Sequence, residues 1–510
     1  MTTTHHVLII GTGFAGLGMA IRLKQAGIHD FTILEHAGGV GGVWRDNHYP
    51  GVACDVESHL YSFSFEPNPN WSRQFAPRAE ILAYLEHCAT KYGVRPHIRF
   101  NSGAKSAVFD ERTGVWTIAT TDGKTIFARV VVSGAGHALS RPILPEIAGI
   151  DSFKGKIFHS ARWDESFALE GKTVAVVGTG ASAIQIVPAI AGKVGQLFLY
   201  QRTPAWVVPK PDRVIPKRER DRFRRIPLLQ RLARTRIYWQ REAMGIGFVV
   251  EPRILKLVEG LALRYLKTSV KDEALRAKLT PHYRLGCKRI LPTNEYYPAL
   301  CRDNVEVVTD GITEIREHGI VTSDGKERTV DAIVLATGFE AAEASSSFDV
   351  RGRGGLTLKE AWKNGIEAYL GTSVAGFPNM FLLIGPNTGL GHSSMVFMIE
   401  SQIAYVLDAI QTMRAKNVKL VDVRADAQAK YNVELQARLA KTVWASGCAS
   451  WYQAKNGKNT TLWPGFTFEF RAKTRRFDPA PYDVVAIEQS WPQPAAEATI
   501  PARGQAAEQR

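Results

Sequence analysis

The sequence is short of cysteine and has no long apolar run. Its five cysteines are Cys54, Cys88, Cys287, Cys301 and Cys448. None of them forms a C-x-x-C pair, which predicts reduced thiols and argues against a disulfide framework, a zinc site or a redox-active disulfide. No apolar run approaches the roughly 20 residues that span a bilayer. Residues 1–6 lack the features of a signal peptide, so the expected location is cytoplasmic.

Acidic residues are scarce relative to basic ones. The formal net charge is +15, and residues 210–236 hold 11 Lys or Arg against three acids. A basic segment of this kind is typical of a solvated helical face or of a surface that steers a polyanionic cofactor. It also allows weak contact with an anionic membrane. No known nucleic-acid-binding motif accompanies the charge, so nucleic acid is not expected as a partner.

Two glycine-rich loops carry the strongest local signal. A short apolar run, 7–10, ends at Gly11, Gly13 and Gly16, which form a G-x-G-x-x-G pattern followed by a helical pattern. In this strand–loop–helix context a pyrophosphate binds at the helix N-terminus. A second apolar run ends at Glu35, whose carboxylate can accept hydrogen bonds from ribose hydroxyls and disfavours a 2′-phosphate. This unit is therefore predicted to bind FAD.

The second loop follows the predicted strand 173–177 and reads G-T-G-A-S-A from Gly178 to Ala183. Alanine at its last position is common in NADP-binding loops. Arg202 follows this loop at the same distance at which Glu35 follows the first one. A guanidinium binds a 2′-phosphate bidentately, whereas a carboxylate repels it. The second unit is therefore predicted to bind NADPH.

Three further stretches carry the resemblance to a known family. Residues 153–164 read F-K-G-K-I-F-H-S-A-R-W-D, residues 41–55 contain G-G-V-W, Y-P-G and a final Asp, and a Lys-Arg pair stands at 288–289. Together with the two loops these motifs resemble the type I Baeyer–Villiger monooxygenases over residues 7–482. The resemblance implies that NADPH reduces FAD, that the reduced flavin activates O2, and that one oxygen atom enters next to a ketone carbonyl to give an ester or lactone.

The resemblance also implies site residues. The catalytic ones are Arg289, Asp55, which holds the arginine, and His159, which fits a hinge better than the chemistry. The implied cofactor-binding residues are Gly11, Gly13, Phe14, Gly16, Glu35, Gly42, Val43, Trp44, Tyr49, Asp55, Tyr61, Gly178, Thr179, Gly180, Ser182, Arg202, Thr203, Lys288, Thr337, Gly338, Asn387 and Trp451. No metal is expected, and the partners are a ketone and O2, with the chain a monomer or dimer.

Other classes stay open at this point. A flavin-containing monooxygenase that oxidises sulfides or amines is the nearest alternative, and Asp55 with the Trp163-Asp164 ending favours the Baeyer–Villiger branch. A flavin disulfide reductase would need a C-x-x-C or C-x-x-x-x-C motif, which the sequence lacks. Residues 388–395 depart from the better-known Baeyer–Villiger members, which leaves the substrate pocket open and makes His392 a further candidate.

The predicted fold class is α/β, with two Rossmann-like dinucleotide-binding domains, for FAD and NADPH, and a helical insertion. Residues 1–150 and 340–484 are expected to form the FAD domain. Residues 151–339 are expected to form the NADPH domain, with the insertion at about 208–282. A Pro-, Ala-, Glu- and Gln-rich end, 485–510, is predicted to be a disordered tail.

Overall fold

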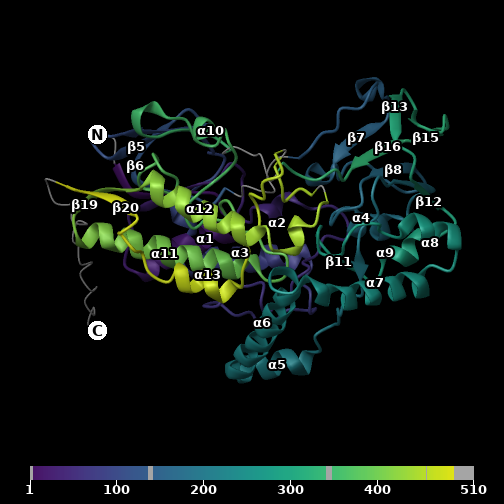
Figure 1. The fold of residues 1–510 in the computed structure, drawn as a ribbon, viewed down its shortest axis with the longest axis horizontal. Helices are drawn as coiled ribbons and strands as arrows, with labels where there is room; N and C mark the ends of the chain where they lie inside the picture. Colours follow the sequence, from purple (N-terminus) through teal and green to yellow (C-terminus); the bar gives the residue numbers. More distant parts are fainter. Residues whose placement is uncertain (1–3, 136–141, 341–346, 449, 455, 488–510) are drawn as a thin grey trace, which may run out of the picture.

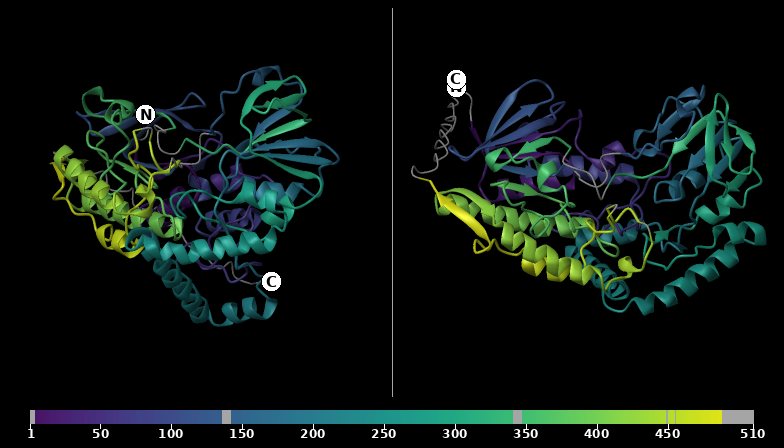
Figure 2. Two further views of the ribbon diagram at one scale, coloured as in Figure 1. Left: turned by 45° about the vertical axis from the view of Figure 1, so that its right-hand side comes forward. Right: turned by 45° about the horizontal axis from the view of Figure 1, so that its top comes forward.

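The computed structural model describes residues 4–135, 142–340, 347–448, 450–454 and 456–487. Two sheet-containing bodies lie side by side, and helices from the middle of the chain run beneath both (Figure 1). The left view of Figure 2 shows helices of the same segment projecting below the rest of the protein. The first body holds a mixed sheet, in which β4, β5 and β6 (residues 104–133) pair antiparallel and the other strands pair in parallel, and the second holds a parallel sheet.

The first body is organised around an eight-stranded sheet of order β17-β4-β5-β6-β1-β2-β3, with β18 beside β6. The two apolar runs before Glu35 form β1 and β2, which pair in parallel. β17 and β18 come from the last third of the chain, which therefore returns to the sheet that the N-terminal part begins. The strands are β1 (Thr4–Ile10), β2 (Phe31–Leu34), β3 (Ile98–Arg99), β4 (Ala104–Asp110), β5 (Val115–Thr120), β6 (Thr125–Ser133), β17 (Asp349–Arg351) and β18 (Met380–Leu382).

Helices cover this sheet through one continuous apolar core. α1 follows the first glycine loop and packs against α11, so the core joins Leu17 and Ile21 to Ile399 and Ile403. The outermost pair, β19 and β20, is antiparallel. The remaining elements of this body are α1 (Phe14–Gln25), α2 (Val43–Asp46), α3 (Arg78–Lys91), α10 (Leu358–Ala361), α11 (Met395–Ala415), β19 (Val418–Val423), α12 (Ala425–Leu439), α13 (Thr467–Lys473) and β20 (Tyr482–Ala486).

The second body contains a five-stranded parallel sheet of order β12-β9-β8-β16-β7. The predicted strand 173–177 is β8 at its centre. A three-stranded antiparallel sheet, β13-β14-β15, adjoins it. The elements are β7 (Lys156–His159), β8 (Thr173–Val177), α4 (Ala183–Ile190), β9 (Gln196–Tyr200), α9 (Tyr296–Leu300), β12 (Val305–Val308), β13 (Ile312–Arg316), β14 (Gly319–Thr322), β15 (Glu327–Thr329) and β16 (Ala332–Leu335).

The stretch 153–164 supplies the edge strand β7 of this sheet. A Cβ on Gly155 would lie 2.4 Å from the Asp331 carbonyl oxygen, so the strand can approach its neighbour this closely only with glycine. Trp163 is buried against Phe158, with ring centroids 5.0 Å apart. The Trp163 carbonyl oxygen lies 3.1 Å from Nε2 of His48, which belongs to the first body. The stretch therefore packs the second sheet and contacts the first body.

The insertion is helical, as expected. It lies between β10 (Val207–Val208) and β11 (Leu291–Pro292), which pair in parallel and so bring its two ends together. Among the described helices, none is long and apolar enough to cross a membrane. The helices of the insertion are α5 (Lys217–Arg225), α6 (Pro227–Val249), α7 (Leu255–Ser269) and α8 (Glu273–Leu279).

Two expectations are wrong. Cys287 and Cys448 form a disulfide with a Cα–Cα distance of 6.3 Å, within the usual range for such bonds. Sequence spacing did not indicate it, because the two cysteines stand 161 residues apart and only tertiary packing brings them together. The predicted tail begins too early, because Val485 and Ala486 belong to β20 and pair with β19. The rest of that tail, from residue 488, lies outside the described residues.

Candidate active site

A cleft of about 2170 Å³ runs between the two bodies. Both glycine-rich loops open onto it, together with residues 41–55 and the Lys288-Arg289 pair. All the cofactor-binding residues predicted from the sequence line it except Gly16 and Asn387. The tertiary structure therefore brings together motifs that are dispersed over nearly the whole sequence.

The first glycine loop is shaped by close backbone contacts. A Cβ on Gly16 would lie 1.9 Å from the Gly11 carbonyl oxygen, so only glycine allows α1 to start this close to β1. Gly13 and Gly42 face each other, and a Cβ on Gly42 would lie 3.0 Å from the Gly13 Cα. Two loops thus approach each other at the N-terminus of α1 without side chains between them. A pyrophosphate requires this geometry to reach the backbone amides.

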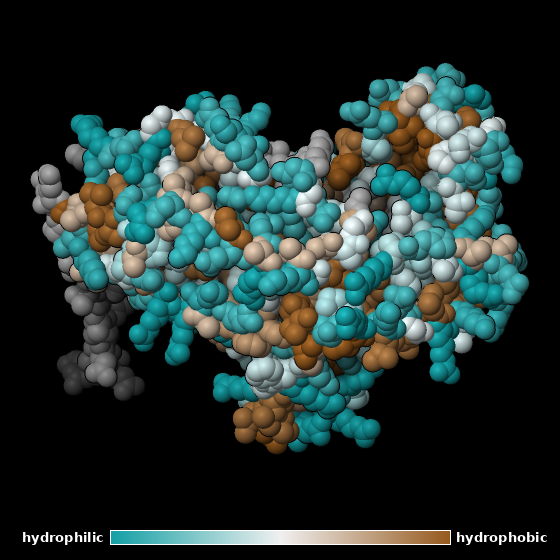
Figure 3. Space-filling model, in the orientation of Figure 1, coloured by the Kyte–Doolittle hydropathy of each residue, from teal (hydrophilic) through white to brown (hydrophobic). Residues whose placement is uncertain are grey.

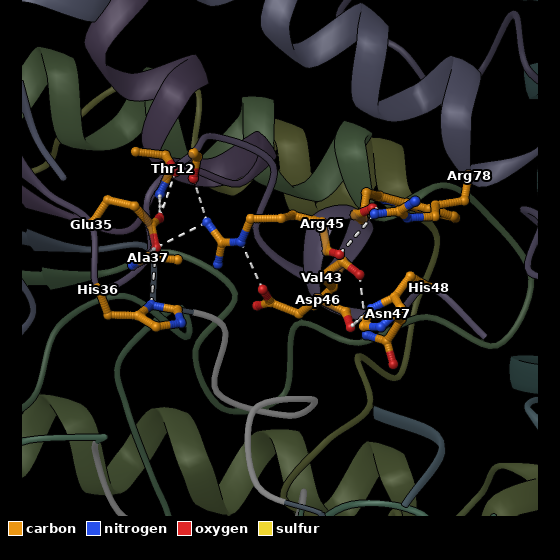
Figure 4. Close-up of polar contacts among 12 residues, drawn as sticks. Thr12, Glu35, His36, Ala37, Val43, Arg45, Asp46, Asn47, His48 and Arg78 are labelled. Carbon is orange, nitrogen blue, oxygen red and sulfur yellow. Dashed lines mark hydrogen bonds and ion pairs between the residues drawn. The ribbon is translucent and has the colours of Figure 1, made fainter. Parts of the chain in front are cut away.

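Glu35 is held at the carboxyl end of β2 by a dense polar network. Its Oε2 accepts hydrogen bonds from the Thr12 amide at 3.0 Å and the Thr12 hydroxyl at 2.5 Å, and its Oε1 lies 3.0 Å from Nη1 of Arg45. Figure 4 shows Arg45 lying between the carboxylates of Glu35 and Asp46. Arg78 in turn donates to the Trp44 and Arg45 carbonyl oxygens. The sequence indicated Glu35 but gave no signal for Arg45 or Arg78.

The second glycine loop faces two cations. Thr179 donates to the Thr203 carbonyl oxygen at 2.7 Å, which fixes the loop to the turn after β9. Burial lowers the pKa of Lys288, and the charge of nearby Arg202 lowers it further. Two neighbouring cations repel each other, so an anion bound between them is favourable. This pair fits the 2′-phosphate of NADPH better than the unphosphorylated ribose of NADH.

The loop 41–55 contacts the second body through α4. Gln185 accepts from the Ala53 amide at 2.8 Å and donates to the Tyr49 hydroxyl at 3.3 Å. Within the loop, Trp44 donates from its indole nitrogen to the Tyr61 hydroxyl at 3.2 Å. Three predicted cofactor residues, Trp44, Tyr49 and Tyr61, are therefore fixed at the boundary of the two bodies.

Arg289 and Asp55 meet in the wall of the cleft. The guanidinium donates from Nε to Asp55 Oδ2 at 3.1 Å and also from Nη2 to the same oxygen. The side chains are 37% and 33% exposed, so both are accessible from the cleft. They stand 234 residues apart in the sequence. The pair forms only because the chain segment between α8 and β11 lies against the loop that ends at Asp55.

The two charges fix each other's ionisation. Burial raises the pKa of the Asp55 carboxyl, but the charge and hydrogen bonds of Arg289, with smaller contributions from Arg241 and Lys210, outweigh burial and hold that pKa below its ordinary value. The Asp55 charge raises the pKa of Arg289 despite burial. The pair is therefore ionised at neutral pH, and Arg289 remains a guanidinium cation facing the cleft.

Side chains of the insertion bind the backbone and the neighbours of Asp55. Arg241 of α6 donates from Nε to Glu57 Oε2 at 2.8 Å and from Nη2 to the Asp55 carbonyl oxygen at 3.3 Å. Lys210 donates to the Cys54 carbonyl oxygen at 3.2 Å. Part of the basic segment thus binds the backbone of the Asp55 loop. The sequence gave no signal for these contacts, because each joins residues more than 150 positions apart.

The other candidates lie around the cleft. His159 is buried, packs edge-on against Phe339, and is not among the described residues that line the cleft. Asn387 is buried and donates to the carbonyl oxygens of Asn459 and Leu462, so it supports the cleft wall. Trp451 lines the cleft, 40% exposed. His392 lies away from it, with Nε2 3.6 Å from Glu242 Oε1 in a fully buried position.

Fold and cleft together define a flavoprotein monooxygenase with two dinucleotide-binding units. Residues 4–217 match the family described as flavin-binding monooxygenase-like. A Baeyer–Villiger monooxygenase of Pseudomonas aeruginosa is 52% identical over 478 residues, covering 93% of this chain and 90% of that protein. The chain therefore belongs to the Baeyer–Villiger monooxygenases.

Solved structures agree with this assignment. An oxidised steroid monooxygenase bound to NADP superposes with a TM-score of 0.83 at 32% identity, covering 95% of this chain and all of that one. The monooxygenase OTEMO, in complex with FAD and NADP, superposes with a TM-score of 0.85 at 27% identity over the same share. The predicted fold class, with two Rossmann-type domains, is confirmed.

Proposed function

We propose that this protein is an FAD- and NADPH-dependent Baeyer–Villiger monooxygenase that converts a ketone, O2, NADPH and a proton into an ester or lactone, water and NADP+. The observation that carries the proposal is the ion pair of Arg289 and Asp55 in a cleft lined by two glycine-rich dinucleotide loops. We also propose the division into domains that the sequence predicts. Residues 1–150 and 340–484 hold FAD, and residues 151–339, with the insertion at about 208–282, hold NADPH.

FAD is assigned to the first glycine loop and its neighbours. Gly11, Gly13 and Gly42 give the pyrophosphate access to backbone amides, while Gly16 brings α1 close behind them. Phe14, Val43, Trp44, Tyr49 and Tyr61 line the path on to Asp55. Glu35, held at the end of β2, is placed for the ribose. When bound, the flavin supplies the redox chemistry that activates O2.

NADPH is assigned to the second loop. Gly178, Gly180 and Ser182 border the cleft beside Thr203, Thr337 and Gly338. Lys288 and Arg202 supply the positive charge for the 2′-phosphate. Trp451, exposed at the cleft wall, is assigned a contact with the cofactor. His159 is assigned a supporting role, because it packs under Phe339, next to the Thr337-Gly338 turn.

Arg289 has the chemistry that oxygen insertion needs. Negative charge must be stabilised on oxygen, first on the activated dioxygen and then on the former carbonyl oxygen of the ketone. A preorganised guanidinium provides hydrogen bonds and charge at no reorganisation cost. Asp55 keeps the guanidinium plane fixed through two hydrogen bonds to one oxygen. Its own charge also keeps Arg289 protonated.

The test compares purified, FAD-loaded wild type with Arg289→Ala and Arg289→Lys on a panel of ketones and sulfides. NADPH consumption, hydrogen peroxide and products by mass spectrometry are recorded together. Ester or lactone formation should fall about 10²- to 10³-fold in Arg289→Ala, while NADPH still reduces the flavin. Sulfoxide as the main wild-type product, formed equally well by Arg289→Ala, would instead support a heteroatom-oxidising flavin monooxygenase.

The proposed partners are a small ketone and O2, for a monomer or dimer in the cytoplasm. We also propose weak contact with an anionic membrane through the basic segment 210–236. The exposed arginines of α5 and of the first half of α6 support it. Other cations of the segment serve the protein itself, since Lys210 binds the Cys54 carbonyl oxygen and Arg234 donates to the His59 carbonyl oxygen at 2.6 Å.

A further inference from the structure

The junction of α5 and α6 combines exposed apolar and basic side chains. Leu228, Leu232 and Trp239 of α6 are 62%, 57% and 56% exposed, and Ile226, just before α6, is 49% exposed. The three α6 positions are separated by four and seven residues, one and two turns, so they share one face of the helix. We call Ile226, Leu228, Leu232 and Trp239 the apolar stripe.

Leu228 and Leu232 of the apolar stripe point to solvent, whereas the Trp239 ring, although 56% exposed, lies 6.1 Å from the ring of Phe468 in α13. On the opposite side, Phe223 packs against His59 with ring centroids 5.1 Å apart, and Gln230 donates to the Asn68 carbonyl oxygen at 2.7 Å. These contacts fix the junction to the first body. The junction projects below both bodies (Figure 1), and a hydrophobic cluster covers its tip in the space-filling view (Figure 3). The contacts with the first body therefore fix the position of the helix that carries the apolar stripe.

Exposed cations flank the apolar stripe. On α6, the 3.6-residue period puts Arg231 on one side of the stripe and Arg236 on the other. The acids of the segment are already used, since Glu219 pairs with Arg213, Asp221 with Arg224, and Asp212 with Arg73. Six exposed cations have no ion-pair partner among the described residues. These six, the basic flank, are Lys217, Arg218, Arg222, Arg225, Arg231 and Arg236.

From this arrangement we infer that the apolar stripe and basic flank form a docking surface for an anionic lipid bilayer. Leucine and tryptophan on one face with arginine beside them is the pattern of helices that lie in the interface of a membrane. A second copy of this chain fits less well. A symmetric dimer through this surface would bring two basic flanks together, and like charges repel. The inference rests on the membrane contact proposed above and assigns it to particular residues, and it is independent of the proposed oxygenation, which the NADPH assay tests separately.

The test is sedimentation of full-length, FAD-loaded protein with vesicles of phosphatidylcholine alone or mixed with phosphatidylglycerol. Wild type should bind the mixed vesicles at low salt, bind the neutral ones much more weakly, and be released as salt rises. Arg225→Gln/Arg231→Gln/Arg236→Gln should weaken binding by roughly fivefold per arginine. Leu228→Ser/Leu232→Ser should weaken binding to the mixed vesicles at low salt.

Val433→Ser is the matched control, because Val433 is 70% exposed on α12, outside the surface. It should bind vesicles like wild type. NADPH oxidation by the variants should be unchanged, since no substituted residue lines the cleft. Binding that is absent in wild type, or equal in all variants, would overturn the inference. So would a wild-type dimer that becomes monomeric in Leu228→Ser/Leu232→Ser without any vesicle binding, since the surface would then be a subunit contact.

Discussion

At the residue scale, the cleft depends on charges that hold one another. Asp55 lies among three cations, Arg289, Arg241 and Lys210, and beside the buried thiol of Cys54 and the hydroxyls of Tyr49, Tyr61 and Tyr452. Of these three cations, only Arg289 contacts the carboxylate directly, while Arg241 and Lys210 bind the carbonyl oxygens of Asp55 and Cys54. A substitution of Arg241 or Lys210 is therefore expected to affect the chemistry at Asp55 and Arg289.

Arg241→Ala tests that expectation. Losing this positive charge raises the pKa of Asp55, because Arg241 is one of the charges that lower it. A carboxylate with a depressed pKa keeps its ion pair above that pKa and loses it as the pH falls. The acidic limb of the pH profile for ketone oxidation should therefore move to higher pH, and more hydrogen peroxide should form per NADPH. Arg241→Lys should restore the pH profile, and an unshifted profile in Arg241→Ala would contradict the prediction.

The Lys288 and Arg202 pair predicts cofactor preference. On the proposed assignment, each contributes a charge-assisted hydrogen bond of about 1.5–3 kcal/mol to the 2′-phosphate. Either alanine variant should therefore raise KM for NADPH by roughly 10- to 100-fold and leave KM for NADH nearly unchanged. The pKa of Lys288 is lowered by burial and by Arg202, so NADPH binding should weaken as the pH rises through that pKa. Steady-state kinetics with both cofactors between pH 6 and about pH 10 checks this.

At the element scale, the disulfide connects two segments of the cleft. Cys287 directly precedes Lys288 and Arg289, and Cys448 precedes Trp451 and Tyr452. Lys288 and Arg289 of the first segment and Trp451 of the second all line the cleft. The disulfide thus ties a wall of the cleft to the segment that carries Arg289.

Reduction should loosen this connection. A disulfide that closes a long loop stabilises by about 2–4 kcal/mol, so dithiothreitol should lower the Tm of the wild type, and Cys287→Ser/Cys448→Ser should show the lowered Tm in either condition. Cys301→Ser is the control, since Cys301 is an exposed free thiol. A wild-type Tm that dithiothreitol leaves unchanged would mean that the bond contributes nothing to stability.

At the scale of the whole molecule, the insertion leaves the second body and contacts the first one. It starts and ends at paired strands, β10 and β11. Between them, α6 reaches the Asp55 loop through Arg241, and Glu242 accepts hydrogen bonds from the Thr467 amide at 2.9 Å and hydroxyl at 2.7 Å in the last helix, α13. The insertion therefore contacts the first body here as well as at the junction of α5 and α6, although in sequence it belongs to the second body.

Much of this architecture is local in origin. The strands before each glycine loop, the helix after the first one, and the helical character of the insertion all follow from apolar period and turn residues within short windows. The acid after one loop and the base after the other likewise indicate the two nucleotides. These features could be predicted because each depends on neighbours in sequence.

The rest was decided by tertiary structure. The 234-residue separation of Asp55 and Arg289, the 161-residue separation of Cys287 and Cys448, and the contact of Arg241 with Glu57 leave no local pattern. A hydrogen bond or disulfide depends on the distance between atoms, and that distance is set only when both bodies and the insertion have packed. By itself, the sequence determined the two nucleotide units and the residue types of the chemistry; packing decided which of those residues meet and what holds them there.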